Sequence, residues 1–95
     1  MSKIVATAVE KLSARLPGGF AGVAKFVIEG EGALIIDSDG VRAADDEADV
    51  TLTADVETFE GILNGDVNAT AAFMQGKLAI DGDMGMAMQL GAALS

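Results

Sequence analysis

The sequence contains no cysteine, histidine, tryptophan or tyrosine among its 95 residues. Without cysteine the chain has no disulfide framework, no thiolate nucleophile and no thiolate ligand for a metal. Without histidine it lacks the side chain that most often acts as an acid or base near neutral pH and most often binds metals. Its four aromatic residues are all phenylalanine, so the core has to be built mainly from Ala, Val, Ile, Leu and Met. These absences disfavour most catalytic and metal-dependent functions.

Long hydrophobic runs are also missing. No segment approaches the roughly 18 consecutive apolar residues of a membrane-spanning helix, and residues 1–19 lack the apolar region and cleavage site of a secretory signal. We therefore expect a soluble, cytoplasmic protein without a stable membrane anchor. The length predicts a single domain over residues 1–95, whose folding removes about 60 to 65% of the unfolded chain's surface from water.

Basic residues are scarce. Six Lys and Arg stand against 15 Asp and Glu, which gives a net charge of −9. Affinity for nucleic acids comes largely from Lys and Arg that neutralise phosphates, so we expect no nucleic-acid partner. The charge also opposes binding to an anionic membrane surface. Lys3, Lys11, Arg15 and Lys25 lie near the start of the chain, so only the first helix could approach an anionic surface, and weakly.

Hydrophobic periodicity predicts one helix and then several strands. Apolar residues from Ile4 to Leu16 recur at helical spacing, and Pro17, Gly18 and Gly19 end the pattern. The segments FAGVAKFVIEG and ALIIDSDG are rich in β-forming residues and are separated by turn residues, which predicts consecutive hairpins. The segment ADVTLTA alternates apolar and polar residues, as expected of a strand with one side exposed to solvent.

Helix caps mark the second half of the chain. Asp55, Asn68 and Asp83 are candidate N-caps of two short helices and of a last helix, Met84–Leu94, and the segment KLAID is a strand before that last helix. Strands joined by tight turns pair antiparallel, and the helices cannot all be crossovers between parallel strands. The predicted fold class is therefore α+β, a five-stranded and mostly antiparallel sheet with helices packed over one face.

Motifs for metals, phosphates and acid–base chemistry all fail. The segments DSDG and DGD resemble parts of a calcium loop, but aligning Gly40 or Gly82 puts Ile35 or Lys77 in the first ligand position. The Gly-Lys pair at 76–77 lacks the other residues of a phosphate-binding loop. The acids at 45–47 lie in the most polar stretch, which favours a solvated loop over a catalytic pair. We therefore expect no metal, no cofactor and no catalytic residue.

Methionine is concentrated near the end of the chain. Four of the five methionines fall between Ala72 and Leu90. The predicted helix Met84–Leu94 is apolar around most of its circumference, so it has to be buried nearly all round or face a ligand. Methionine fills gaps in cores and also lines surfaces that accept variable apolar partners, so both interpretations stay open. The same ambiguity applies to Phe59, Ile62, Leu63, Phe73 and Met74.

The segment AAFMQGKLAIDGDMGMAMQL resembles the signature of the sterol carrier protein-2 (SCP-2) family, which runs as Ala-Phe, an apolar residue, Gly-Lys-Leu, Ile and then Gly-Asn/Asp-Met. The preceding segment, ADVTLTADVETFEGILNGDVNATAAF, is similar to the family's strand, short helix with Phe, glycine-ended turn and second short helix. The resemblance spans Gly19 to Leu94. It implies an apolar tunnel between the sheet and the helices that holds a fatty acyl chain, acyl-CoA or a sterol.

The resemblance also implies which residues line that tunnel. The strand residues Val27 and Ile35 alternate with the implied ones, so the sequence leaves open which sheet face lines it. Gln75 is the implied polar group nearest the ligand. The implied apolar lining residues are Phe26, Ile28, Leu34, Ile36, Phe59, Ile62, Phe73, Met74, Met84 and Met88.

Three functions follow as hypotheses. The first is a carrier domain that binds a fatty acyl chain, acyl-CoA, sterol, isoprenoid or other apolar small molecule and catalyses nothing. The second is an accessory protein that presents a lipid or isoprenoid intermediate to a partner enzyme, with acidic residues at 45–49 and 57–60 meeting a basic surface. The third, an enzyme that uses carboxylates, is disfavoured by the missing His and Cys.

Overall fold

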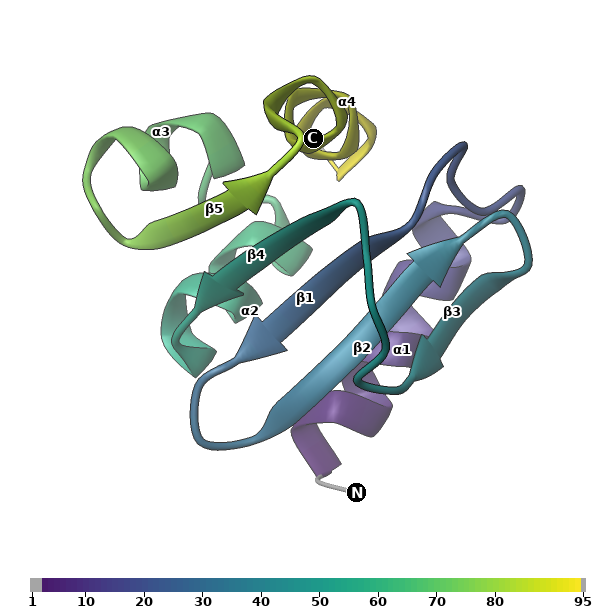
Figure 1. Ribbon diagram of the computed structural model, residues 1–95. Coiled ribbons are helices and arrows are strands. Elements are labelled where there is room, and N and C mark those ends of the chain that lie inside the picture. The colour runs from purple at the N-terminus through teal and green to yellow at the C-terminus, as the bar shows by residue number, and fades with distance from the viewer. Residues whose placement is uncertain (1–2, 95) are drawn as a thin grey trace.

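The computed structural model describes residues 3–94, and its elements follow the order that the sequence predicts. One helix precedes four strands, two short helices, a fifth strand and a last helix (Figure 1). The last helix has the predicted bounds. The elements are α1 Lys3–Arg15, β1 Ala24–Ile28, β2 Gly32–Asp37, β3 Gly40–Ala43, β4 Val50–Ala54, α2 Val56–Asn64, α3 Ala69–Met74, β5 Leu78–Gly82 and α4 Met84–Leu94.

The five strands form one mixed sheet in the order β3-β2-β1-β4-β5. The pairs β1–β2, β2–β3 and β4–β5 are antiparallel, whereas β1 and β4 are parallel. The predicted hairpins and the mostly antiparallel sheet are confirmed. The one parallel pair arises because residues 44–49 carry the chain from β3, at one edge, back across β2 and β1 to β4 (Figure 1).

Strand register places one row of apolar residues across the whole sheet. Ala43 pairs with Leu34, Leu34 with Phe26, Phe26 with Leu52, and Leu52 with Ile80. Successive side chains of a strand point to opposite faces, so these five lie on the same face. The helix α1 packs against β2 and β3 there, and α4 packs against β4 and β5.

The helix-covered face holds the main core. The rings of Phe26 and Phe59 meet edge to face, with centroids 4.6 Å apart and an interplanar angle of 61°. Such aromatic pairs contribute about 0.5–1.5 kcal/mol beyond the area they bury. Leu12 of α1 and Leu90 of α4 are fully buried in the same cluster. The sheet face that the helices cover is therefore the one that carries Phe26.

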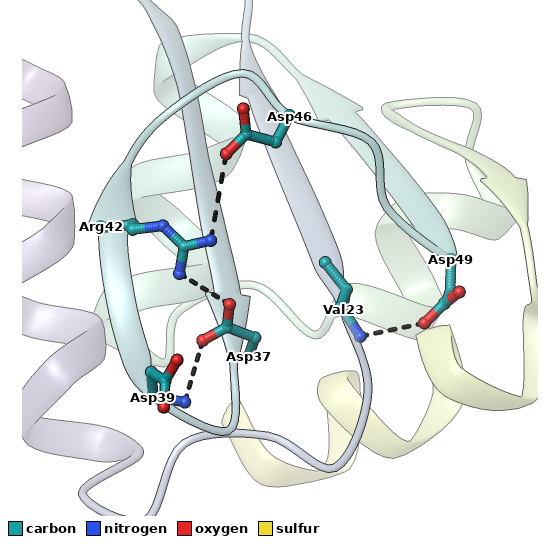
Figure 2. Close-up of polar contacts among 6 residues, drawn as sticks. All are labelled: Val23, Asp37, Asp39, Arg42, Asp46 and Asp49. Atoms are coloured by element: carbon teal, nitrogen blue, oxygen red, sulfur yellow. Dashed lines mark hydrogen bonds and ion pairs between the residues drawn. The ribbon is translucent and has the colours of Figure 1, made fainter.

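The other sheet face is covered by the crossing connection, residues 44–49. Ile35 points to this face and is fully buried, and Figure 1 shows the connection passing over β2. Arg42 ties β3 to this region, with Nη1 2.6 Å from Asp37 Oδ2 and Nη2 4.0 Å from Asp46 Oδ2 (Figure 2). The hydrogen bond from Arg42 lowers the pKa of Asp37.

Three further contacts hold the two ends of the crossing connection. Lys25 Nζ lies 2.8 Å from Asp45 Oδ1. The backbone N–H of Val23 donates to Asp49 Oδ2 at 3.1 Å (Figure 2), and the backbone N–H of Asp49 donates to the Val23 carbonyl at 2.8 Å. The side chains of Asp45 and Asp46 are 77% and 68% exposed, as expected of a solvated loop. These acids also fix the path of the connection over the sheet.

Asp55 caps α2 as the sequence predicts. Its carboxylate accepts the backbone N–H of Thr58 at 2.7 Å, and this hydrogen bond lowers the pKa of Asp55. At the other end Gly65 adopts φ 81°, a left-handed conformation that glycine takes without strain. The cap and the glycine fix both ends of the helix that carries Phe59.

Replacing Asp55 by Asn removes the titrating group and keeps the cap, because Asn and Asp are about equally good at this position. A pKa lowered by folding means that the carboxylate stabilises the folded state above its ordinary pKa of 3.8, and that this stabilisation is lost as the pH falls through the folded-state pKa. We expect Asp55→Asn to match the wild type near neutral pH and to become relatively more stable below about pH 4. Urea unfolding followed by circular dichroism measures the difference, and a difference that does not change with pH would contradict the assignment.

Candidate functional site

Four large apolar side chains are exposed in the described part of the chain, and all four lie at one place. Phe73 is 38% exposed, Met74 80%, Met84 43% and Met88 56%. Phe73 and Met74 come from α3, and the two other methionines come from α4. All four line the same pocket. A contiguous exposed apolar surface of this kind marks a binding site more often than scattered single residues do.

The pocket is a groove of about 190 Å³ between α3, α4 and the β4–β5 end of the sheet. Its floor is formed by Leu52, Leu78 and Ile80, of which Leu52 and Ile80 are paired across the two strands. In Figure 1 α3 and α4 both lie above β5, α3 to the left and α4 to the right. Thr70 is the one polar side chain among the lining residues. The groove is lined by Leu52, Ala69, Thr70, Phe73, Met74, Leu78, Ile80, Met84, Ala87, Met88 and Gly91.

Short-range capping builds both helical walls. The side chain of Asn68 accepts the backbone N–H of Ala71 at 3.1 Å, and Asp83 accepts that of Met86 at 3.1 Å, so both predicted N-caps are confirmed. Gly82 joins β5 to α4 with φ 110°, and a Cβ there would lie 2.4 Å from the Asp49 carbonyl oxygen. Only glycine fits this position, which holds the start of α4 close to β4.

The methionines of α4 divide between two sides of the helix. A Cβ added at Gly22 would lie 2.3 Å from Met86 Cε, so Met86 packs closely against the segment before β1. Met84 and Met88 instead line the groove. Gly85 and Gly91 make α4 a poor helix former, at about 1 kcal/mol each relative to Ala. The helix therefore depends on its contacts with the sheet and with α3.

The remaining residues implied by the family resemblance lie elsewhere. Gln75 is exposed and is the C-cap residue of α3, outside the groove lining. The six implied residues of the sheet and α2 are at most 2% exposed and pack in the core; a role for them in contacting a ligand stays a prediction. They are Phe26, Ile28, Leu34, Ile36, Phe59 and Ile62.

Sequence reasoning missed the groove floor. Leu52 lies in the alternating segment ADVTLTA, and Leu78 and Ile80 lie in the predicted strand KLAID, but neither pattern singles them out as ligand contacts. That alternation could have identified them, because it puts Leu52 on the helix-covered face, and the antiparallel pairing of β4 with β5 then brings Ile80 beside it. The small residues Ala69 and Gly91 carry no such signal in the sequence.

A second pocket, of about 140 Å³, adjoins the groove. It lies between the α2–α3 connection and the end of α4, and Ala69 and Gly91 line both pockets. A Cβ added at Gly91 would lie 3.5 Å from the Cβ of Ala69, so the two walls approach closely there. The second pocket is lined by Ile62, Gly65, Val67, Asn68, Ala69, Gly91 and Leu94.

Arg15 links the ends of the first and last helices. Its Nη1 donates a hydrogen bond to the carbonyl oxygen of Leu94, 79 residues away in the chain. Carbonyl groups at a helix C-terminus lack partners within the helix and carry partial negative charge, so a guanidinium there is favourable. This contact fastens the C-terminal end of α4 to α1.

The chemistry of the site is that of an apolar surface. No charged side chain is among the groove-lining residues. Within residues 3–94, no group of three or more Asp, Glu, His or Cys side chains is placed to hold a metal ion. None of the helices in that range is long and apolar enough to cross a membrane. The groove can take an apolar group out of water, and none of its side chains can transfer a proton at neutral pH.

Comparison with known proteins gives the same fold and a family. The model of the SCP-2 sterol transfer family matches residues 5–95. Hydroxysteroid dehydrogenase-like protein 2 of Danio rerio is 42% identical over 77 residues, which cover 73% of this chain and 19% of that protein. The chain spans 12% of another curated relative, peroxisomal multifunctional enzyme A of Dictyostelium discoideum. It thus matches under a fifth of either relative's length.

Solved structures of the same family are similar over nearly the whole chain. The crystal structure of sterol carrier protein 2 like 2 from Aedes aegypti is 27% identical, with a TM-score of 0.76, and the match covers 94% of each chain. The solution structure of sterol carrier protein-2 from Aedes aegypti in complex with palmitate is 24% identical, with a TM-score of 0.80, covering 100% of this chain and 97% of that one.

Replacing Arg15 by Met removes the hydrogen bond to Leu94 and keeps the apolar stem of the side chain. A hydrogen bond to a charged group contributes about 1.5–3 kcal/mol, so amide hydrogen exchange in the last turn of α4 should quicken about tenfold or more. Arg15→Lys keeps the charge and loses the planar guanidinium, so its exchange rate in this turn should lie between those of the wild type and Arg15→Met. Exchange measured by NMR gives α2 as an internal reference, and equal acceleration in α2 and α4 would show a global loss of stability instead.

Proposed function

The chain belongs to the SCP-2 sterol transfer family, and we propose that it is a lipid-binding or carrier domain that catalyses no reaction. Its ligand is an apolar molecule with an extended chain or a flat polycyclic body, such as a fatty acyl chain, an isoprenoid or a sterol. The groove takes part of that ligand out of water without making or breaking a bond.

One observation supports this proposal most directly. The exposed large apolar side chains of residues 3–94 all line one groove, and no charged side chain lines it with them. Exposing Met74 at 80% and Met88 at 56% to water is unfavourable unless the surface is used. Methionine suits such a surface, because its unbranched, polarizable side chain adapts to ligands of different shape.

The size of the groove limits how it can bind. At about 190 Å³ it is smaller than the roughly 300–1,000 Å³ of typical small-molecule sites. Burying a methylene contributes about 0.8 kcal/mol, and micromolar affinity needs a net free energy of about −8 kcal/mol after the costs of association. About ten or more methylenes therefore have to be buried. The groove has to widen to hold them.

The wall best suited to move is α4. Its two internal glycines weaken it as an independent helix, and its side chains Met84 and Met88 are the flexible groups on that side of the groove. The floor of the groove cannot move as easily, because Leu52 and Leu78 belong to the paired strands β4 and β5. A ligand is therefore enclosed when α4 shifts and repacks over it.

A second candidate function is presentation of the bound lipid to a partner enzyme. The observation that favours it is that the chain matches under a fifth of two much longer relatives whose names are those of enzymes. The acidic residues at 45–49 lie over one sheet face and the exposed Glu57 and Glu60 of α2 lie over the other, so they offer two separate surfaces for a basic partner. Such a partner would bind the lipid-loaded domain more tightly than the empty one, and equal binding of both would contradict this function.

Introducing a carboxylate into the groove tests the proposed site. Met88→Glu places a charge that a bound apolar chain would have to desolvate, so we expect affinity for a fluorescent fatty acid to fall more than tenfold. Glu is a good helix former, and Met88 is 56% exposed, so the variant keeps its fold. The matched control is Gln89→Glu, one residue further along α4, which adds the same charge at an exposed position outside the groove lining.

Equal loss of affinity in Met88→Glu and Gln89→Glu would show an effect of net charge and contradict the site. Lipid extraction and native mass spectrometry of the purified wild type test the function itself. The proposed function is contradicted if the purified protein carries no lipid and also binds neither fatty acids nor acyl-CoA in titration.

Ligand binding should also slow amide hydrogen exchange in the last helix, α4. If α4 is the wall that closes, hydrogen exchange across Met84–Leu94 falls when a fatty acid is added, because open conformations of α4 release the ligand. Exchange in α1 serves as the reference. Equal protection of α4 with and without bound ligand would show that α4 is not the moving wall.

A further inference from the structure

The groove and the second pocket share two lining residues, Gly91 of α4 and Ala69 of α3, which face each other. We propose that Gly91 determines how long an apolar chain the site accepts. A short chain fills the groove alone. A longer chain continues between α3 and α4, past Ala69, and enters the second pocket. This inference rests on the proposed lipid-binding function and assigns the site its preference for chain length.

The fold itself does not require glycine at position 91. A Cβ there would meet the Cβ of Ala69 at 3.5 Å, an ordinary van der Waals distance, and Gly91 is not among the residues with positive φ. Gly82 and Gly61 differ, since an added Cβ would lie 2.4 Å from the Asp49 carbonyl oxygen and 2.5 Å from Val67 Cγ2. Alanine is a better helix former than glycine. Glycine at 91 thus gives up helix stability and leaves space at the junction of the two pockets.

The chemistry of the second pocket suits the end of an apolar chain. Ile62, Val67 and Leu94 provide apolar walls, and no charged side chain is among its lining residues. The carboxamide oxygen of Asn68 is already engaged by the backbone N–H of Ala71. A methylene that enters this pocket contacts these apolar walls, while the guanidinium of Arg15, bonded to the Leu94 carbonyl, lies beside the pocket.

The two pockets adjoin each other, and both are small. Each is smaller than a typical small-molecule site, at about 190 and 140 Å³. In this structure the close approach of Gly91 to Ala69 lies between the two pockets, so a chain that fills both has to part α3 from α4 there. Because Gly91 has no side chain, α4 has to move less far to let a chain pass Ala69. A bulky side chain at 91 blocks the passage and takes up space in the groove only at the end that adjoins the second pocket.

A series of saturated fatty acids, from octanoate to stearate, tests the inference by competition against a fluorescent fatty acid. For the wild type we expect affinity to rise up to about fourfold per added methylene until both pockets are full, and then to level off. Because position 91 also lines one end of the groove, for Gly91→Leu we expect a small loss of affinity for the shortest acids that bind, an earlier plateau, and at least tenfold weaker binding of the longest acids. Ala92→Leu adds the same side chain at the next, exposed position, outside both pocket linings, and should follow the wild type.

Ala69→Leu narrows the same junction from the α3 side and should also shorten the preferred chain, which keeps the test decisive if Gly91→Leu does not fold. NMR of the methyl groups of Val67 and Leu94 adds a direct signal, because long acids should shift them in the wild type and short acids should not. A wild type that binds no fatty acid of the series refutes lipid binding itself. Binding by the wild type with the same plateau in the folded junction variants, or loss of short and long acids alike, overturns the role of Gly91 and leaves lipid binding intact.

Discussion

The register of β1 with β2 and β4 is the constraint on which the rest of the structure depends. It aligns Leu34, Phe26 and Leu52, and the pairing of β4 with β5 extends the row to Ile80. A slip of one residue would turn every member of the row to the other face. Because the row is continuous, one apolar surface crosses five strands. The helices cover most of it, and the groove lies where α3 and α4 leave large apolar side chains exposed.

The sheet is buried more completely under α1 and α2 than under α3 and α4, and the lengths and sequences of these helices explain why. The long helix α1 and the capped helix α2 bury Leu34 and Phe26 completely. Over β4 and β5 the cover comes from α3, which has six residues, and from α4, which contains two glycines. These two helices leave Ile80 only partly buried and expose Phe73 and Met88. The site is thus a property of the same packing that forms the core.

The sequence predicts local features well because their causes are local. The caps at Asp55, Asn68 and Asp83 and the bounds of α4 depend on residues within one or two turns. The parallel pairing of β1 with β4 could not be predicted from periodicity, because it depends on how residues 44–49 cross the sheet. The family resemblance implied a tunnel that includes Phe26 and Phe59, but burial on a shared face does not show which apolar residues contact a ligand.

The absence of charge in the groove bears on what can give the site its selectivity. A polar head group finds Thr70 as its one polar side chain among the lining residues, so it remains at the mouth, in water, on a protein of net charge −9. Hydrogen bonds and ion pairs within the groove therefore contribute little to discrimination between head groups. The apolar part of the ligand supplies the affinity, in proportion to the surface that is buried. On the proposed binding mode, discrimination depends on the shape and length of the apolar part, and we expect the small residues Ala69 and Gly91 to set the length because they line both pockets.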